Sequence, residues 1–112
     1  PADCALRILV SVVSTAVRGQ CVIDGGSKTF SLNPTKVVGG YGNFIDRPWT
    51  LEKLNEEHGY VRVAEGAARV GEKIWVIPGR AGTCVNLHDE IAFGRGDRVE
   101  GRWKVAARGC VR

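Results

Sequence analysis

The sequence has no methionine, no Cys-x-x-Cys pair, no signal peptide and no apolar stretch of membrane-spanning length. These absences predict a cytoplasmic protein that does not enter a membrane and whose cysteines are free, mostly buried thiols. Pro1 also leads almost directly into an apolar run, without an initiator methionine. We therefore expect a piece of a longer protein.

The motifs of two large enzyme classes are missing. No Gly-x-Ser-x-Gly elbow occurs, which argues against a serine hydrolase. The stretch "IDGGSKT" (23–29) does not have the spacing of a phosphate-binding loop, and we expect no helix after it. A bare turn or bulge is the better interpretation of its two glycines.

Basic residues are common but show little clustering. The formal net charge is +4, and the arginines lie mostly as single residues along the chain. A dedicated nucleic-acid binder gathers its charges on one stripe with interleaved aromatics, so nucleic acid is not the favoured partner. Only Arg98, Arg102 and Lys104 are expected to share one strand face. A stand-alone, non-enzymatic β-barrel that binds anionic partners through this face is one alternative function.

Glycine and short β-branched runs are what the sequence does contain. Fifteen glycines in 112 residues favour tight turns between strands. They predict an all-β single domain over residues 1–112, a small β-barrel or Greek-key-like fold of about six or more short strands. The clearest predicted strands are 6–17, 21–24, 73–78, 88–94 and 98–105.

The stretch "TLEKLNEEHGYVRV" (50–63) is ambiguous. Thr50 is a suitable cap for one short helix through Asn55, whereas "YVRV" is extended, and we favour strand from about Asn55 onward. The last strand alternates more clearly, with Val99, Gly101 and Trp103 between charged residues. It is expected to be half-buried and to pair through the "GRGD" turn with "EIAF".

The two histidines are candidates for chemistry, because an imidazole can ligate a metal or transfer a proton near neutral pH. His58 follows Glu56–Glu57, and His88 precedes Asp89–Glu90. A carboxylate beside an imidazole raises its basicity and orients it. A histidine that is simply solvated or satisfied in a core is the more common case.

Cys84 and His88 lie four residues apart. On a helix they would share one face, whereas on a strand they would stand about 13 Å apart at ~3.3 Å per residue unless a turn closes the gap. A small metalloprotein that uses Cys84 and His88, with His58 as a further ligand, is a second alternative function. A thiolate at Cys84 with Arg80 nearby is conceivable, and burial of Cys84 in a strand is the plainer interpretation.

Four ordered blocks carry a family resemblance: "VVSTAVRGQCVIDGGSKTFS", "NEEHGYVRV", "IPGRAGTCVNLHDE" and "WKVAARG". With these blocks, which span nearly the whole chain, the sequence resembles the C-terminal domain of the D-threonine aldolase and eukaryotic-type D-serine dehydratase family. The resemblance implies an alanine racemase-like enzyme. In that domain arrangement an N-terminal (β/α) barrel carries pyridoxal phosphate on a lysine, and a C-terminal β-domain completes the active site, usually across a dimer.

The resemblance also implies a divalent metal in the β-domain. Its ligands are a histidine and, two residues later, a cysteine or aspartate, in a Pro-Asn-His-x-Cys loop just ahead of "VNLHDE". The metal would act on the substrate hydroxyl as a Lewis acid. In this sequence the histidine position is Arg80 and the cysteine position is Gly82. A protonated guanidinium has no lone pair to give and glycine has no side chain, so we expect the metal site to be lost.

None of the five lysines lies in a segment that resembles the cofactor-bearing strand, so this chain alone is expected to bind no pyridoxal phosphate and to be inactive. We expect a lyase in the full-length context, a barrel domain or protomer as partner, an amino-acid substrate and a homo-oligomer. His58 and Arg80 are the catalytic candidates. Arg80 would hold a substrate carboxylate bidentately, or it is a solvated arginine in a decayed site.

Overall fold

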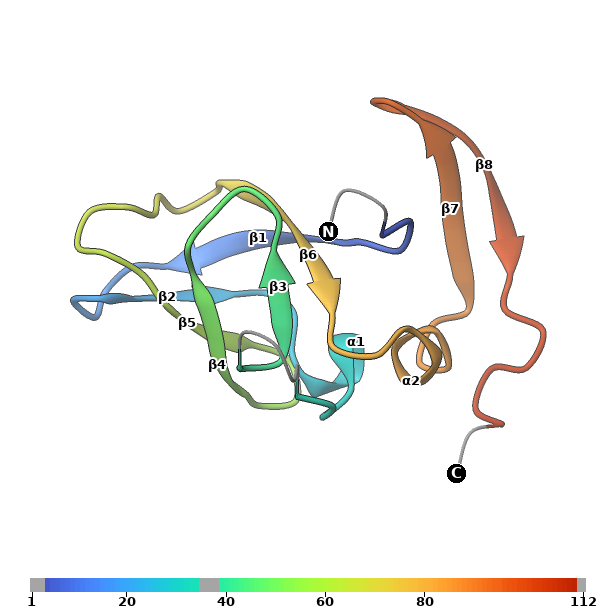
Figure 1. Cartoon of the computed structure of the whole chain (residues 1–112), viewed down its shortest axis with the longest axis horizontal. Coiled ribbons are helices and arrows are strands. Elements are labelled where there is room, and N and C mark those ends of the chain that lie inside the picture. The colour runs from blue at the N-terminus through green and yellow to red at the C-terminus, as the bar shows by residue number, and fades with distance from the viewer. Residues whose placement is uncertain (1–3, 35–38, 111–112) are drawn as a thin grey trace.

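Six short antiparallel strands close into a barrel in the computed structural model, which describes residues 4–34 and 39–110 (Figure 1). The order around the barrel is β1-β2-β5-β4-β3-β6. The six strands are β1 (Ile8–Ser14), β2 (Gln20–Ile23), β3 (Gly42–Phe44), β4 (Thr50–Leu54), β5 (Gly59–Arg62) and β6 (Lys73–Pro78). Outside the barrel lie α1 (Ser27–Phe30), α2 (Ala81–Val85), β7 (Glu90–Arg95) and β8 (Arg98–Lys104).

The barrel closes because β1 pairs with both of its neighbours. Val12 lies opposite Ile23 of β2, and Ile8 lies opposite Val76 of β6. Side chains alternate across a strand, so Val10 and Val12 point into the barrel while Leu9 and Val13 remain exposed. A closed barrel leaves none of these six strands with an unpaired edge along the sheet.

The barrel interior holds a continuous apolar core, and the residues of each strand supply it. Its buried members are Val10, Val12, Cys21, Ile23, Phe30, Phe44, Trp49, Leu51, Val61, Ile74 and Val76. Phe30 comes from α1, and its ring passes so close to Gly25 that a Cβ there would lie 2.6 Å from the ring. Gly26 similarly lets α1 approach the β4–β5 turn, because a Cβ on it would lie 2.4 Å from the Asn55 carbonyl oxygen.

The predicted all-β barrel is confirmed, with strands at β1, β2, β6, β7 and β8 where the sequence predicted them, and β1 pairs with β2 as a hairpin. Two expectations about helices were wrong. Residues 50–54 form β4 rather than a helix, because Leu51 is needed in the core and alternates with exposed Glu52. A one-turn helix, α1, does follow the glycine pair in "IDGGSKT", and α2 is a second.

The hairpin of β7 and β8 forms a separate two-stranded sheet, which Figure 1 shows standing beside the barrel and joined to it through α2. The expected pairing through residues 95–98 is confirmed, but the expected half-burial is wrong, since Val99 and Trp103 are exposed. A register shift also leaves Glu100 as an extra residue, with Val99 opposite Gly94 and Gly101 opposite Phe93. Side chains therefore change face at this bulge, and Arg98 does not share a face with Arg102 and Lys104.

Among the described residues, no helix is of a length and apolarity that would let it cross a membrane.

Candidate functional site

The segment between β6 and the hairpin is held against the loop that follows α1. Gly79 packs on the backbone of Asn33, where a Cβ would lie 2.2 Å from the Asn33 carbonyl oxygen. The Thr83 hydroxyl donates a hydrogen bond of 2.6 Å to Asn33 Oδ1, and the Ser31 hydroxyl donates one of 2.5 Å to the same atom. Ser31 itself has φ 65° and ψ 174°, a conformation that non-glycine residues rarely adopt. Asn33 therefore fixes the loop that carries Arg80 and Gly82.

Arg80 is the residue before α2, and its side chain is exposed. Its carbonyl oxygen accepts from the Cys84 amide at 3.3 Å, which begins the helical turn. Within residues 4–34 and 39–110 no carboxylate forms an ion pair with its guanidinium. Gly82 lies in α2 with open space where a Cβ would stand. The loop therefore presents one cation and no metal-ligating side chain at the two positions.

Cys84 and His88 are brought together, because α2 and the turn after it close the distance that a strand would leave. Cys84 Sγ donates to the Thr29 carbonyl oxygen at 3.2 Å, and His88 Nε2 lies 2.9 Å from the same oxygen. A carbonyl only accepts, so Nε2 carries the hydrogen. Both polar atoms are thus directed at one backbone oxygen of α1, and their contact joins α1 to α2.

Cys84 is completely buried, as its plainer interpretation had it, but it lies in α2 rather than in a strand. Burial raises the pKa of its thiol to about 11, which argues against the alternative of a thiolate beside Arg80. The described part of the chain contains no group of three or more His, Cys, Asp or Glu side chains that would hold a metal ion. Cys21 is buried in the barrel core and its pKa is also raised to about 11, mainly by desolvation, while Cys4 and Cys110 are exposed.

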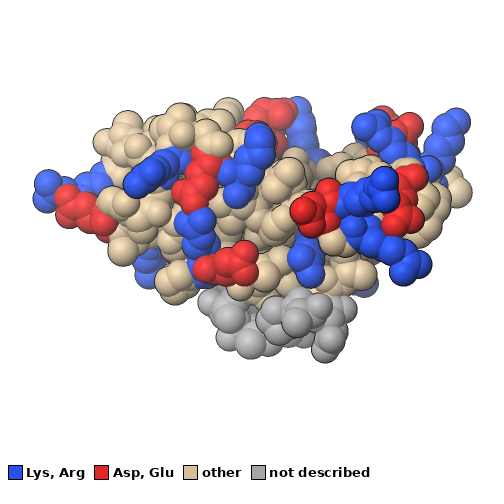
Figure 2. All heavy atoms as spheres, turned by 90° about the horizontal axis from the view of Figure 1, so that it is seen from above, with Lys and Arg blue, Asp and Glu red and all other residues tan. Residues whose placement is uncertain are grey.

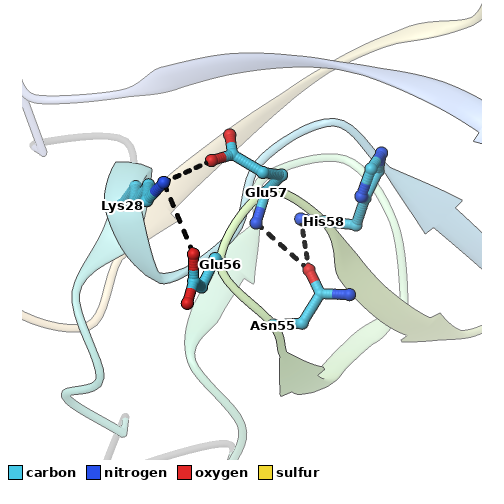
Figure 3. Close-up of polar contacts among 5 residues, drawn as sticks. All are labelled: Lys28, Asn55, Glu56, Glu57 and His58. Carbon is cyan, nitrogen blue, oxygen red and sulfur yellow. Dashed lines mark hydrogen bonds and ion pairs between the residues drawn. The ribbon is translucent and has the colours of Figure 1, made fainter.

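His58 lies in the turn between β4 and β5, on the barrel side of the molecule (Figure 3). The Asn55 side-chain oxygen accepts from the backbone amides of Glu57 at 3.1 Å and His58 at 2.6 Å, which shapes the turn. Figure 3 shows the His58 imidazole directed away from the Lys28 ammonium, which binds both neighbouring carboxylates instead. The exposed imidazole points away from Lys28 but remains near enough to Glu57 to contribute, after Lys28, to the lowered pKa of that carboxyl.

The ion pairs at Lys28 shift the pKa of two groups. Hydrogen bonding and charge attraction from Glu57, and then from Glu56, raise the pKa of Lys28. The same contact lowers the pKa of the Glu57 carboxyl. Lys28 follows the glycine pair of "IDGGSKT", and its ammonium is used to join α1 to the β4–β5 turn. A structural role thus accounts for this lysine.

The carboxylates next to His88 are also paired with cations. Asp89 binds Arg108, and Glu90 binds Arg102 at 3.5 Å. Arg95 lies 3.6 Å from Glu100 across the hairpin. Figure 2 shows basic and acidic side chains intermixed at this end of the molecule. The bulge and these pairs break up the basic stripe that an anion-binding strand would need.

The residues that organise this region were not apparent from sequence. Asn33 was interpreted only as part of an Asn-Pro turn, and Thr29 and Thr83 carried no signal. Thr29 contributes a backbone oxygen, which every residue type possesses, so no side-chain pattern marks it. Asn33 and Thr83 are 50 residues apart in sequence, and only the closed barrel brings them together.

Comparison with known proteins defines the family. Residues 5–93 match the family model described as "Putative serine dehydratase domain", which is most of the chain. The chain belongs to this family. The matched proteins include large aldolases and a small mycobacterial protein.

The large relatives contain this chain as one part. It is 35% identical over 105 residues to the 3-hydroxy-D-aspartate aldolase of Paracoccus denitrificans, a match that covers 94% of this chain and 26% of that protein. The crystal structure of D-threonine aldolase from Filomicrobium marinum matches with a TM-score of 0.78 and 32% identity, over 95% of this chain and 29% of that chain. The chain therefore spans less than a third of the length of these aldolases.

The small relative is an uncharacterized protein of Mycobacterium tuberculosis. It is 35% identical over 119 residues, and the match covers 97% of this chain and 87% of that protein. The mycobacterial protein is therefore little longer than the part that the family members share. The sequence of this chain is therefore matched both by part of long aldolases and by most of a short protein.

Proposed function

We propose that this chain is the C-terminal β-domain of a pyridoxal phosphate-dependent lyase that acts on a D-hydroxy amino acid, and that it completes an active site whose cofactor is held by a separate barrel domain. The observation that carries this proposal is the match along nearly the whole chain to a D-threonine aldolase structure of which the chain is only 29%. The named activities of the relatives concern hydroxylated D-amino acids. The rest of such an enzyme would supply the cofactor-binding lysine that this chain lacks.

The barrel domain belongs either to the same polypeptide or to another chain. The mycobacterial relative favours a second chain in its own case, because it has little length beyond the matched region. Pyridoxal phosphate, when bound by the barrel, supplies the electron sink for bond cleavage next to the substrate amine. The part of the β-domain in that reaction is to bind and orient the substrate and to keep water out.

The metal that the family resemblance implies does not fit this chain. Arg80 and Gly82 occupy the two ligand positions, and neither has a lone pair to offer. Cys84 cannot replace them without giving up its hydrogen bond to Thr29, because a ligating thiolate has no hydrogen to donate. We propose that the complete protein works without the divalent metal of its relatives.

Arg80 is proposed to bind the substrate carboxylate. Its guanidinium is exposed and forms no ion pair with the described carboxylates, while the Gly79 and Thr83 contacts to Asn33 fix the backbone around it. A planar guanidinium with several donors suits bidentate recognition of a carboxylate. His58 is the second proposed catalytic residue, because its imidazole is exposed and points away from Lys28, which binds both neighbouring carboxylates.

The proposal can be tested with a chimaera in which this chain replaces the matching part of the Filomicrobium aldolase. We expect the chimaera to retain pyridoxal phosphate and to cleave D-threonine at a rate that chelator and added Mn²⁺ leave unchanged. A charged hydrogen bond contributes roughly 1.5–3 kcal/mol, so Arg80→Gln should raise KM by about tenfold or more. Arg18→Gln, a change to an exposed arginine in the β1–β2 connection, is the matched control. Loss of activity in chelator would contradict the metal-free mechanism, and an unchanged KM in Arg80→Gln would contradict the carboxylate role.

A further inference from the structure

The hairpin and the barrel enclose an apolar groove that no described segment fills. Two adjoining hollows, of about 370 and 540 Å³, lie between β6, the hairpin and the segment that leads into β1. The residues that line both hollows define the hairpin groove: Leu6, Arg7, Trp75, Ile91, Ala92 and Val99. Arg7 is the single charged residue common to both hollows, while Glu90 lines the first and Asp97 and Arg98 line the second. The groove therefore has an apolar centre with charged side chains at its edges, as docking sites often do.

The exposure of the groove is unusual for residues of these types. Trp75 is 44% exposed and Val99 is 69% exposed, although both belong to strands. The strands β7 and β8 pair only with one another among the described residues. An isolated two-stranded hairpin is marginally stable in water and needs a further surface to pack against. The barrel of this chain therefore does not supply the further packing surface that the hairpin needs.

We infer that the hairpin groove is the surface on which the pyridoxal phosphate barrel domain docks, an inference that rests on the proposed function. The occupant would present an apolar surface to the centre of the groove and polar groups to its edges, where Glu90, Asp97 and Arg98 lie. Domain interfaces of this sort bury roughly 600–1,500 Å² and combine an apolar centre with a polar rim. The ion pairs Glu90–Arg102 and Arg95–Glu100 lie on the hairpin strands, where they would form such a rim.

The position of the chain's beginning supports this occupant. Leu6 and Arg7 line the groove and lead directly into β1, and Figure 1 shows this blue segment running between β6 and β7. A domain joined ahead of this segment would therefore enter the structure beside the groove. The D-threonine aldolase structure matches 95% of this chain with only 29% of its own length, so most of that polypeptide lies outside the matched part.

Two matched valine substitutions test the inference. Val99→Arg places a charge in the groove. Val70→Arg makes the same change at a valine that is 63% exposed in the β5–β6 connection, a segment that Figure 1 shows extending away from the hairpin and that lines neither hollow. In the isolated chain neither change should alter the thermal midpoint, because both side chains are already in water. In the Filomicrobium chimaera, Val99→Arg should reduce D-threonine cleavage about tenfold or more and lower the thermal midpoint, as a charge at the centre of an interface does. Val70→Arg should leave both within twofold of the unsubstituted chimaera.

Three outcomes would overturn the inference. The first is a Val99→Arg chimaera as active and stable as its Val70→Arg control, which leaves the proposed function standing. The second is an isolated chain that dimerises in sedimentation velocity and becomes monomeric with Val99→Arg, since the occupant is then a second copy. The third is an unsubstituted chimaera that retains no pyridoxal phosphate and has no activity, in which case the proposed function fails as well.

Discussion

The barrel and the hairpin of this chain differ in how far they bury their apolar side chains. Both are antiparallel, but the barrel closes on itself around Leu51, Val61 and Val76, none of which is accessible to water. The hairpin stacks Phe93 on Trp103 at a ring distance of 4.4 Å and still leaves Trp103 60% exposed. The barrel carries its own stability, whereas the hairpin depends on something outside it. The hairpin is therefore the region of the chain in which an interface with a partner is expected.

The largest expected effect concerns the barrel core. Leu51→Ala removes a completely buried side chain and should lower the free energy of unfolding by about 2–5 kcal/mol. The same change at Leu32, which is 62% exposed, should lower it by no more than about 0.5 kcal/mol. Urea denaturation followed by tryptophan fluorescence measures both. Equal losses would mean that the barrel core does not dominate the stability.

The second prediction concerns the two buried thiols, one in the barrel and one in α2. Cys21 and Cys84 keep their protons in the folded state up to a pKa of about 11, while an unfolded thiol ionises near 9.0. Their contribution to stability is present below pH 9 and is lost between pH 9 and 11, because only the unfolded state then releases protons. The slope is at most about 1.4 kcal/mol per pH unit for each thiol.

Denaturation curves at pH 8 and pH 10.5 check this loss, and Cys84→Ala should reduce its size. Cys110→Ala, a change at an exposed thiol, is the control and should leave the loss as it is. A stability that does not respond to pH in this range would mean that the buried thiols are reached by water.

The third prediction compares two glycines that a sequence does not distinguish. Gly26→Ala would place a Cβ 2.4 Å from the Asn55 carbonyl oxygen, and overpacking of this kind costs about 1–3 kcal/mol. Gly82→Ala adds a methyl group in open space within α2 and should be neutral or stabilising by up to about 1 kcal/mol. Thermal denaturation of the two variants should therefore move in opposite directions. A harmless Gly26→Ala would contradict the close packing of α1 on the β4–β5 turn.

The smallest expected effect lies in the hairpin. Trp103→Ala removes the stack on Phe93, which contributes roughly 0.5–1.5 kcal/mol, and the loss should be confined to β7 and β8. Hydrogen exchange followed by NMR should show faster exchange of hairpin amides in this variant and unchanged protection in β1, β5 and β6. Faster exchange in the barrel strands as well would mean that the two regions unfold as one unit.

The sequence predicted the regions whose structure depends on local alternation. The run at β1 was identified from its β-branched residues and its partial alternation, the run at β6 from an apolar stretch that ends at Pro78-Gly79, and the run at β8 from clear alternation. The short helix α2 was not predicted, because five residues are too few to show helical periodicity and no side chain caps its start. The bulge at Glu100 was missed for a related reason, since register is set by the partner strand.

The candidate site was predicted in part and for similar reasons. The loop around Arg80, Gly82 and Cys84 was identified from its residues and from the family resemblance. Its anchoring on Asn33 and on the Thr29 carbonyl was not, because these contacts join segments about 50 residues apart through atoms that carry no sequence signal. Whether Arg80 and His58 act on a substrate stays a prediction that the chimaera tests.

The packing of Gly79 on Asn33 bears on how such a domain changes over time. The metal loop that the family resemblance implies has an asparagine at position 79, where a Cβ would now lie 2.2 Å from the Asn33 carbonyl oxygen. Arg80→His and Gly82→Cys would restore the two ligand types, yet an asparagine at position 79 would collide with the Asn33 backbone. The loop after α1 would then have to move as well, so these three substitutions alone would not rebuild the loop that the resemblance implies.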